Sequence, residues 1–285
     1  MRKSSGFTLI ELLVVIAIIA LLMSILMPAL SKAKDLAMGA ACKGNLKNYT
    51  LAVAMYCDDN DGKFPQAERC YFSSPDPYPI ESGISNPFHL RWCNGDVDLK
   101  SHPEYGGQLF SYLMDAKSFI CPAFKRLASQ NSQDQFYLAQ GSSIRNYEPW
   151  YNYTMNAYLG SNSDTLEETR VLNVSEVRKP ATTFSFTEES SYVDTEYNQS
   201  GLNDTFMIPG NDSMIQGWLS QVGGNPRLVK PGPSPEGVGA FYDTIAGFHH
   251  APSGNKLGGR GNCAFLDGHV DSHYRSETFY LAWPK

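Results

Sequence analysis

The side chains best suited to chemistry gather near the C-terminal end of the chain. They are His249, His250, Asp267, His269 and His273. Imidazole and carboxylate groups bind metals, and Asp267 and His269 would face one side of a strand because they are two positions apart. No nucleophile motif, phosphate-binding loop or His-Glu-x-x-His sequence accompanies them. A hydrogen-bonded structural role is therefore favoured, and we expect neither an enzyme nor a metal site.

An acidic run earlier in the chain is a second candidate site. Residues 58–62, DDNDG, resemble part of a calcium loop, and placing Gly62 at the sixth position puts Glu68 at the twelfth. The first ligand position then falls on Cys57, which offers no oxygen ligand, and no apolar helix follows. A solvated turn is the better interpretation of this run.

The cysteines show no spacing typical of a metal or redox site. None of them forms a Cys-x-x-Cys pair, which disfavours a zinc ribbon and a thioredoxin-like centre. Disulfides formed outside the cytoplasm are the more natural use, although the sequence does not choose the pairing. The six cysteines are Cys42, Cys57, Cys70, Cys93, Cys121 and Cys263.

Composition limits the class of protein. The net charge is -6, and basic residues form no block beyond scattered pairs such as Lys32 and Lys34, so no nucleic-acid partner is expected. Many Gly, Pro, Tyr and Phe residues favour a loop-rich, β-containing exported domain. The residues that follow the apolar N-terminal run suffice for one large domain.

The elements that must position these residues begin with a membrane span. Residues 12–31 carry no charge, and at about 1.5 Å per residue they match a hydrocarbon core of roughly 30 Å. Pro28 removes a backbone donor, so we expect it to kink the helix, although a proline that merely ends the span is an alternative.

An amphipathic helix should follow the span. Apolar residues recur there at helical spacing, and the first strong stop signal is the run 58–62, which predicts one broken helix over about 8–57. This apolar face is expected to pack under a sheet. Its members are Leu36, Cys42, Leu46, Tyr49, Val53 and Tyr56.

The remaining elements are expected to be short. Asp267-Gly268 suits a type I′ turn between two strand-like runs, which predicts a C-terminal hairpin over 261–274. Residue types elsewhere predict a short helix at 108–114 and strands at 151–158, 171–177 and 182–187.

Residues 3–11, KSSGFTLIE, closely resemble the leader of type IV prepilins and type II secretion pseudopilins. The resemblance implies that a prepilin peptidase cuts between Gly6 and Phe7 and that Phe7 becomes N-methylated. It also implies that the basic leader is cytoplasmic, and that the ectodomain is periplasmic on a single-pass protein of the bacterial inner membrane. Other pilin or pseudopilin subunits, an inner-membrane assembly platform and the lipid bilayer are the implied partners.

Glu11 is the informative residue beside the cleavage site. A carboxylate drawn toward the bilayer centre costs about 2.5–3.5 kcal/mol, so it should find a partner. The α-amino group of Phe7, freed by cleavage, supplies a cation, and in the pilin family this pairing is thought to link neighbouring subunits. The alternative is a glutamate that reaches to the membrane interface.

A second resemblance covers most of the chain. Asp267-Gly268 is similar to the C-terminal signature of a large group of pilin-like proteins, a histidine, nine residues and Asp-Gly, with His250 as the histidine although 16 residues separate it from Asp267. Because Cys42 and Cys121 lie in motifs of that group, they are the first expected disulfide, followed by Cys57 with Cys70. Other similar segments occur in the same order at 42–47, 56–65, 121–122, 152–156 and 177–180.

Together these features predict an α+β, pilin-like fold with a long helix packed on an antiparallel sheet. We expect a leader at 1–6, a transmembrane helix at 7–31 and an ectodomain at 32–285. The expected function is a structural subunit of a type II secretion pseudopilus or a type IV pilus. A membrane-tethered binding module is the alternative, and a tethered metal-dependent enzyme is less favoured. We expect no cofactor, with calcium kept as a candidate because some major pseudopilins use it.

Overall fold

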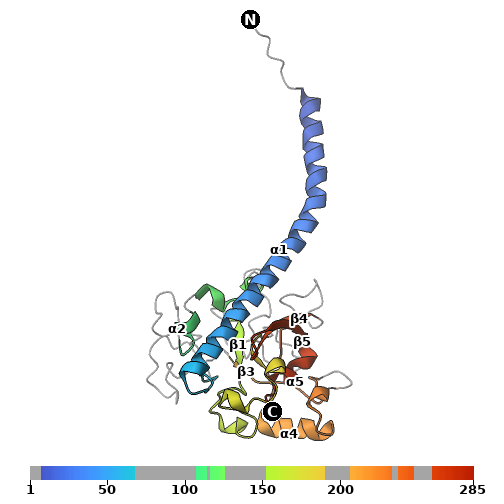
Figure 1. Ribbon diagram of the computed structural model, residues 1–285. Helices are drawn as coiled ribbons and strands as arrows, with labels where there is room; N and C mark the ends of the chain where they lie inside the picture. The colour runs from blue at the N-terminus through green and yellow to red at the C-terminus, as the bar shows by residue number, and fades with distance from the viewer. Residues whose placement is uncertain are drawn as a thin grey trace, which may run out of the picture.

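A computed structural model shows a long helical stalk that ends on a folded ectodomain (Figure 1). The stalk, α1, spans Leu9–Asp59, and its lower half lies against the ectodomain. The structure describes residues 8–67, 107–113, 116–125, 152–189, 206–232, 237–246 and 259–285.

The helix α1 is continuous through Pro28. This proline cannot donate a hydrogen bond to the carbonyl of Ser24, yet the residues on both sides stay helical because the neighbouring turns keep their own bonds. The predicted break in this helix is therefore wrong, whereas the kink expected at Pro28 stays a prediction. Figure 1 shows instead that α1 changes direction along its length, without a loss of helical structure.

The lower half of α1 presents one apolar face to the ectodomain. Cys42, Leu46, Tyr49 and Val53 are all buried, as their helical spacing predicts. Leu36 is 76% exposed, so its predicted place on this face is wrong. Leu36 is exposed because it precedes the part of α1 that packs on the core, which begins at Met38.

The ectodomain is built on one five-stranded sheet of order β3-β1-β2-β4-β5. The predicted α+β class is confirmed, but the purely antiparallel sheet is wrong because β1 and β3 pair in parallel. All other neighbours are antiparallel. The strands are β1 Tyr153–Asn156, β2 Phe184–Glu188, β3 Phe206–Met207, β4 Arg260–Phe265 and β5 Val270–Tyr274.

Two apolar cores cover the sheet. The first joins α1 to strand residues such as Tyr153 and Phe186, with Tyr49 only 4.6 Å from Phe186 between ring centroids. The second contains Trp218 of α4, Asp212–Gln221, and Phe279 of α5, Thr278–Ala282. Because side chains alternate across strands, the two cores use different residues of the same strands.

The short connecting elements differ in part from expectation. A helix does form within 108–114, as α2 Phe110–Leu113. The strand predicted at 171–177 is wrong, since Asn173 and Glu176 form a reciprocal cap on a 3₁₀ turn, which diverts the backbone from strand pairing. The 3₁₀ turns are η3 Ala116–Phe119, η5 Asp164–Leu166, η6 Val174–Glu176, η7 Pro180–Thr182, η8 Pro226–Leu228 and η9 Arg275–Glu277.

The predicted C-terminal hairpin is present as β4 and β5, but its turn is of another type. Gly268 N donates to Phe265 O over 2.9 Å, and Phe265 N donates to His269 O over 2.9 Å. Gly268 has φ +93° whereas Asp267 does not have a positive φ. A type I′ turn needs both, so the loop is instead a three-residue turn closed by a glycine bulge.

Gly268→Ala should lower the free energy of unfolding by about 1–2 kcal/mol, because a Cβ disfavours its left-handed backbone. Gly217→Ala is the matched control, since Gly217 lies inside α4 with open space around it. Alanine there should be neutral or stabilising by up to about 1 kcal/mol. Denaturant unfolding followed by tryptophan fluorescence measures both, and equal effects would contradict this account of the turn.

Candidate assembly site

The N-terminal end of α1 is closed by a capping box. Glu11 N donates to Thr8 Oγ1 over 3.3 Å, and Thr8 N and Oγ1 each donate to Glu11 Oε2 over 2.8 Å. Such reciprocal bonds satisfy donors that the first helical turn leaves without partners. Thr8 therefore starts the helix at the residue that follows the expected mature N-terminus.

The carboxylate of Glu11 lies on the exposed surface of this first turn. Its bonds to Thr8 all use Oε2. Gly6 and Phe7 lie outside the described residues, so the cleavage site and the amine partner of Glu11 stay predictions. Sequence reasoning found Glu11 but missed Thr8, although threonine three residues before glutamate at the start of an apolar run is a known capping signal.

The first half of α1 exposes apolar side chains all round. Among the described residues, α1 is the one helix that is long and apolar enough to cross a membrane, and its most apolar stretch is entirely unburied. Exposed side chains run from Leu9 to Leu30. Exposure of such an apolar surface to water is unfavourable in free energy, whereas lipid or neighbouring helices can cover it.

A disulfide fixes the ectodomain to α1 just beyond this stretch. Cys42 of α1 and Cys121 are bonded, with 5.0 Å between their Cα atoms, and both are fully buried. The carboxylate of Glu188 lies close to both sulfurs. Since the sulfurs are bonded to each other, they are not free thiolates, and these three residues do not fit a metal site.

Polar side chains surround the disulfide and join three segments. Asn45 Nδ2 donates to Ile120 O and to Tyr153 Oη, both over 3.4 Å. Tyr153 Oη also donates to Cys42 O, and Cys121 N donates to Asn152 Oδ1. Sequence reasoning noted these segments only as similar to a family. Their role is to hold α1, the Cys121 segment and β1 together.

The turn of the C-terminal hairpin makes a second attachment to α1. Lys47 Nζ donates a hydrogen bond to the carbonyl of Gly268. Asp267 accepts from His269 N over 3.1 Å and lies 2.5 Å from His269 Nδ1. Burial alone would raise the pKa of Asp267, but the bonds from His269 outweigh it and lower that pKa. Asp267-Gly268 thus acts as a docking turn.

Of the candidate histidine and aspartate group, Asp267 and His269 pair at the turn, whereas His273 pairs with a different carboxylate. His269 stacks on Phe265 with 4.2 Å between ring centroids. His273 Nδ1 instead lies 3.3 Å from Glu277 Oε2. His249 and His250 lie outside the described residues, so the histidine of the signature stays a prediction.

Two further cysteines are buried free thiols. Cys57 is unbonded, so the predicted bridge to Cys70 is wrong, and Cys70 itself lies outside the described residues. Burial, with a contribution from Asp58, raises the pKa of Cys57 to about 11. Cys263 is also free, and burial raises its pKa further. The raised pKa values favour the protonated thiol at neutral pH over the thiolate, which is the reactive form.

Known proteins share the sequence of the N-terminal segment that contains the exposed part of α1. Residues 1–27 match the family model described as the prokaryotic N-terminal methylation motif. Type II secretion system core protein G of Pseudomonas aeruginosa is 39% identical over 113 residues, which is 39% of this chain and 75% of that protein. The chain therefore belongs to the family of pseudopilins and type IV pilins.

A second relative matches a shorter segment of this chain than the first. Type IV wide pilus major component PilA4 of Thermus thermophilus is 44% identical over 61 residues, 21% of this chain and 47% of that protein. The matched segment thus spans under half of this relative. No solved structure matches the chain. Family membership and the apolar helix together indicate a membrane-anchored, pilin-like protein, with α1 as the one candidate span among the described residues.

Replacing both Cys42 and Cys121 by serine should lower the free energy of unfolding by roughly 4 kcal/mol, because the bridge closes a long loop. Denaturant unfolding with and without reductant measures the effect. Reductant should destabilise the wild type by a similar amount and leave the double variant unchanged. Equal stability of oxidised wild type and variant would show that the disulfide does not hold the junction.

Proposed function

We propose that prepilin peptidase cuts this chain between Gly6 and Phe7, that Phe7 is N-methylated, and that the mature chain enters a filament. The filament is a type II secretion pseudopilus or a type IV pilus, in which the chain is a structural subunit. The match of residues 1–27 to the methylation motif supports the processing step. The similarity to both kinds of filament protein supports the assembly step.

The observation that carries the proposal is the unburied apolar half of α1. Before assembly, the bilayer covers this surface, with the leader in the cytoplasm and the ectodomain in the periplasm. The inner-membrane assembly platform then transfers the helix from lipid to a bundle of like helices. Both surroundings are apolar, so the transfer keeps the surface away from water.

The carboxylate of Glu11 needs a polar partner that the lipid does not provide. Cleavage creates an α-amino group four residues before it, and a neighbouring subunit can present that group to the carboxylate. A charged hydrogen bond of this kind is worth about 1.5–3 kcal/mol. The capping bonds from Thr8 stabilise the start of the helix and leave the negative charge of Glu11 available for this pair.

The ectodomain favours a specialised subunit over a major one. It is far larger than the segment shared with the two relatives. Identical bulk on every subunit would crowd a close-packed helical bundle. We therefore infer that the chain occupies few positions in the filament.

Glu11→Gln separates charge from capping, since glutamine can still accept the bonds from Thr8 but carries no charge. With peptidase and assembly platform present, this variant should be processed normally while cross-linked filament oligomers fall about tenfold or more, as expected for a loss of about 1.5 kcal/mol.

Thr8→Val is the matched control for that experiment. It weakens the cap by about 1 kcal/mol and keeps the charge, so assembly should stay close to wild type. Normal assembly of Glu11→Gln, with failure of Thr8→Val, would instead assign Glu11 a capping role alone.

A further inference from the structure

A groove of the ectodomain lies apart from the assembly site and is lined by cations. Its volume is about 560 Å³, and Arg178, Lys179 and Arg227 are among its lining residues. None of the described residues that line it is a carboxylate, although the chain as a whole has a net charge of -6. The groove is therefore a local positive site on an acidic protein.

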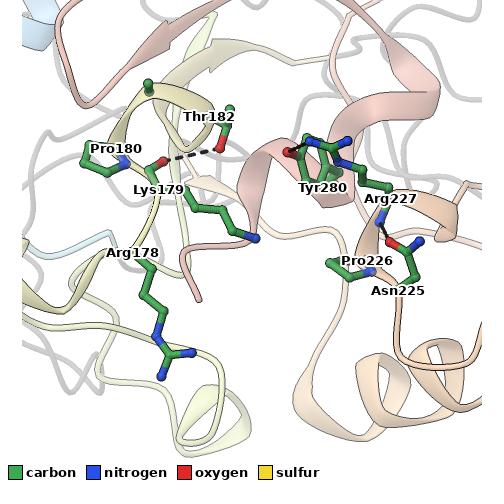
Figure 2. Close-up of a pocket in the computed structure, with 9 residues that line it drawn as sticks. Arg178, Lys179, Pro180, Thr182, Asn225, Pro226, Arg227 and Tyr280 are labelled. Carbon is green, nitrogen blue, oxygen red and sulfur yellow. Dashed lines mark hydrogen bonds between the residues drawn. The ribbon is translucent and has the colours of Figure 1, made fainter.

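The cations come from two different segments that face each other. Figure 2 shows Lys179, just before η7, and Arg227, in η8, on opposite walls of the groove, whereas the Arg178 side chain points away from both. Like charges repel, so this arrangement costs free energy unless an anion enters between them. All three cationic residues are exposed to solvent.

Tyr280 of α5 organises the wall that carries Arg227. Arg227 Nη2 donates to Tyr280 Oη over 2.9 Å, and the guanidinium carbon lies 4.9 Å from the ring centroid. Lys179 Nζ lies 5.9 Å from the same centroid. The bond from Arg227 is the main cause that lowers the pKa of Tyr280. The Tyr280 oxygen accepts this bond, and the side chain of Thr182 also interacts with it.

The backbone on both sides is held in place. Arg227 N donates to Asn225 Oδ1 over 3.1 Å, which fixes the start of η8. Arg178 N donates to Pro284 O over 3.1 Å, which ties the opposite wall to the C-terminal segment. The cationic side chains therefore extend from two anchored segments.

We propose that this groove binds a small oxyanion, a carboxylate or phosphate group, between Lys179 and Arg227. The planar guanidinium can bind two oxygens of such a group at once, and the ammonium adds a point charge. A volume of about 560 Å³ lies in the range of small-molecule sites. The overall negative charge opposes a long polyanion such as nucleic acid, which favours a small ligand.

Calorimetric titration of the full chain in an uncharged detergent tests the groove. The probes are inorganic phosphate, D-galacturonate as a carboxylated sugar, and D-galactose as its neutral counterpart. Wild type should bind at least one oxyanion and not galactose. Lys179→Gln with Arg227→Gln should weaken that binding at least tenfold.

Lys63→Gln with Lys125→Gln is the matched control, because it removes two exposed cations that do not line the groove. This control should retain the wild-type affinity within about twofold. The tighter probe identifies phosphate or carboxylate as the ligand group. Absence of oxyanion binding, equal binding of galactose, or equal loss in both double variants would overturn the proposal. Glu11 and α1 take no part, so the site and filament assembly can fail separately.

Discussion

The whole structure depends on one helix whose two halves lie in different surroundings. The first half of α1 is apolar on all sides, and its second half is apolar on one side only. Hydrophobic burial therefore places the second half on the sheet, where Leu46 and Tyr49 enter the core, and leaves the first half projecting. A capping box closes the N-terminal end of this helix, and a disulfide holds the ectodomain on its second half.

The attachment of the ectodomain to α1 is reinforced by two unlike links. The disulfide of Cys42 lies in the core, and the bond from Lys47 to Gly268 lies on the surface about one and a half helical turns further along. The first ties α1 to the middle of the chain and the second to its C-terminal end. The stalk is thus connected to two separate parts of the ectodomain.

The sequence alone predicts the features that follow from local physical rules. Uninterrupted apolar residues predict the span, and helical spacing predicts the buried face with Cys42 and Val53. The parallel pair of β1 and β3 was not predictable, because two-residue pairing depends on distant segments rather than local propensity. Tyr280 and Arg227 likewise meet only in the folded chain. The strand prediction around Asn173 failed because the side chain of this residue caps a 3₁₀ turn. That turn replaces the extended backbone that the neighbouring β-branched residues favour.

The central claim is that this chain is a processed filament subunit. Peptide and intact mass spectrometry of membranes from cells that make the chain with its matching prepilin peptidase tests that claim most directly. The account predicts a mature chain that begins at methylated Phe7, and its loss when Gly6 is replaced by alanine. A chain that still begins at Met1 in the presence of active peptidase would contradict the claim and leave a tethered ectodomain with no route into a filament.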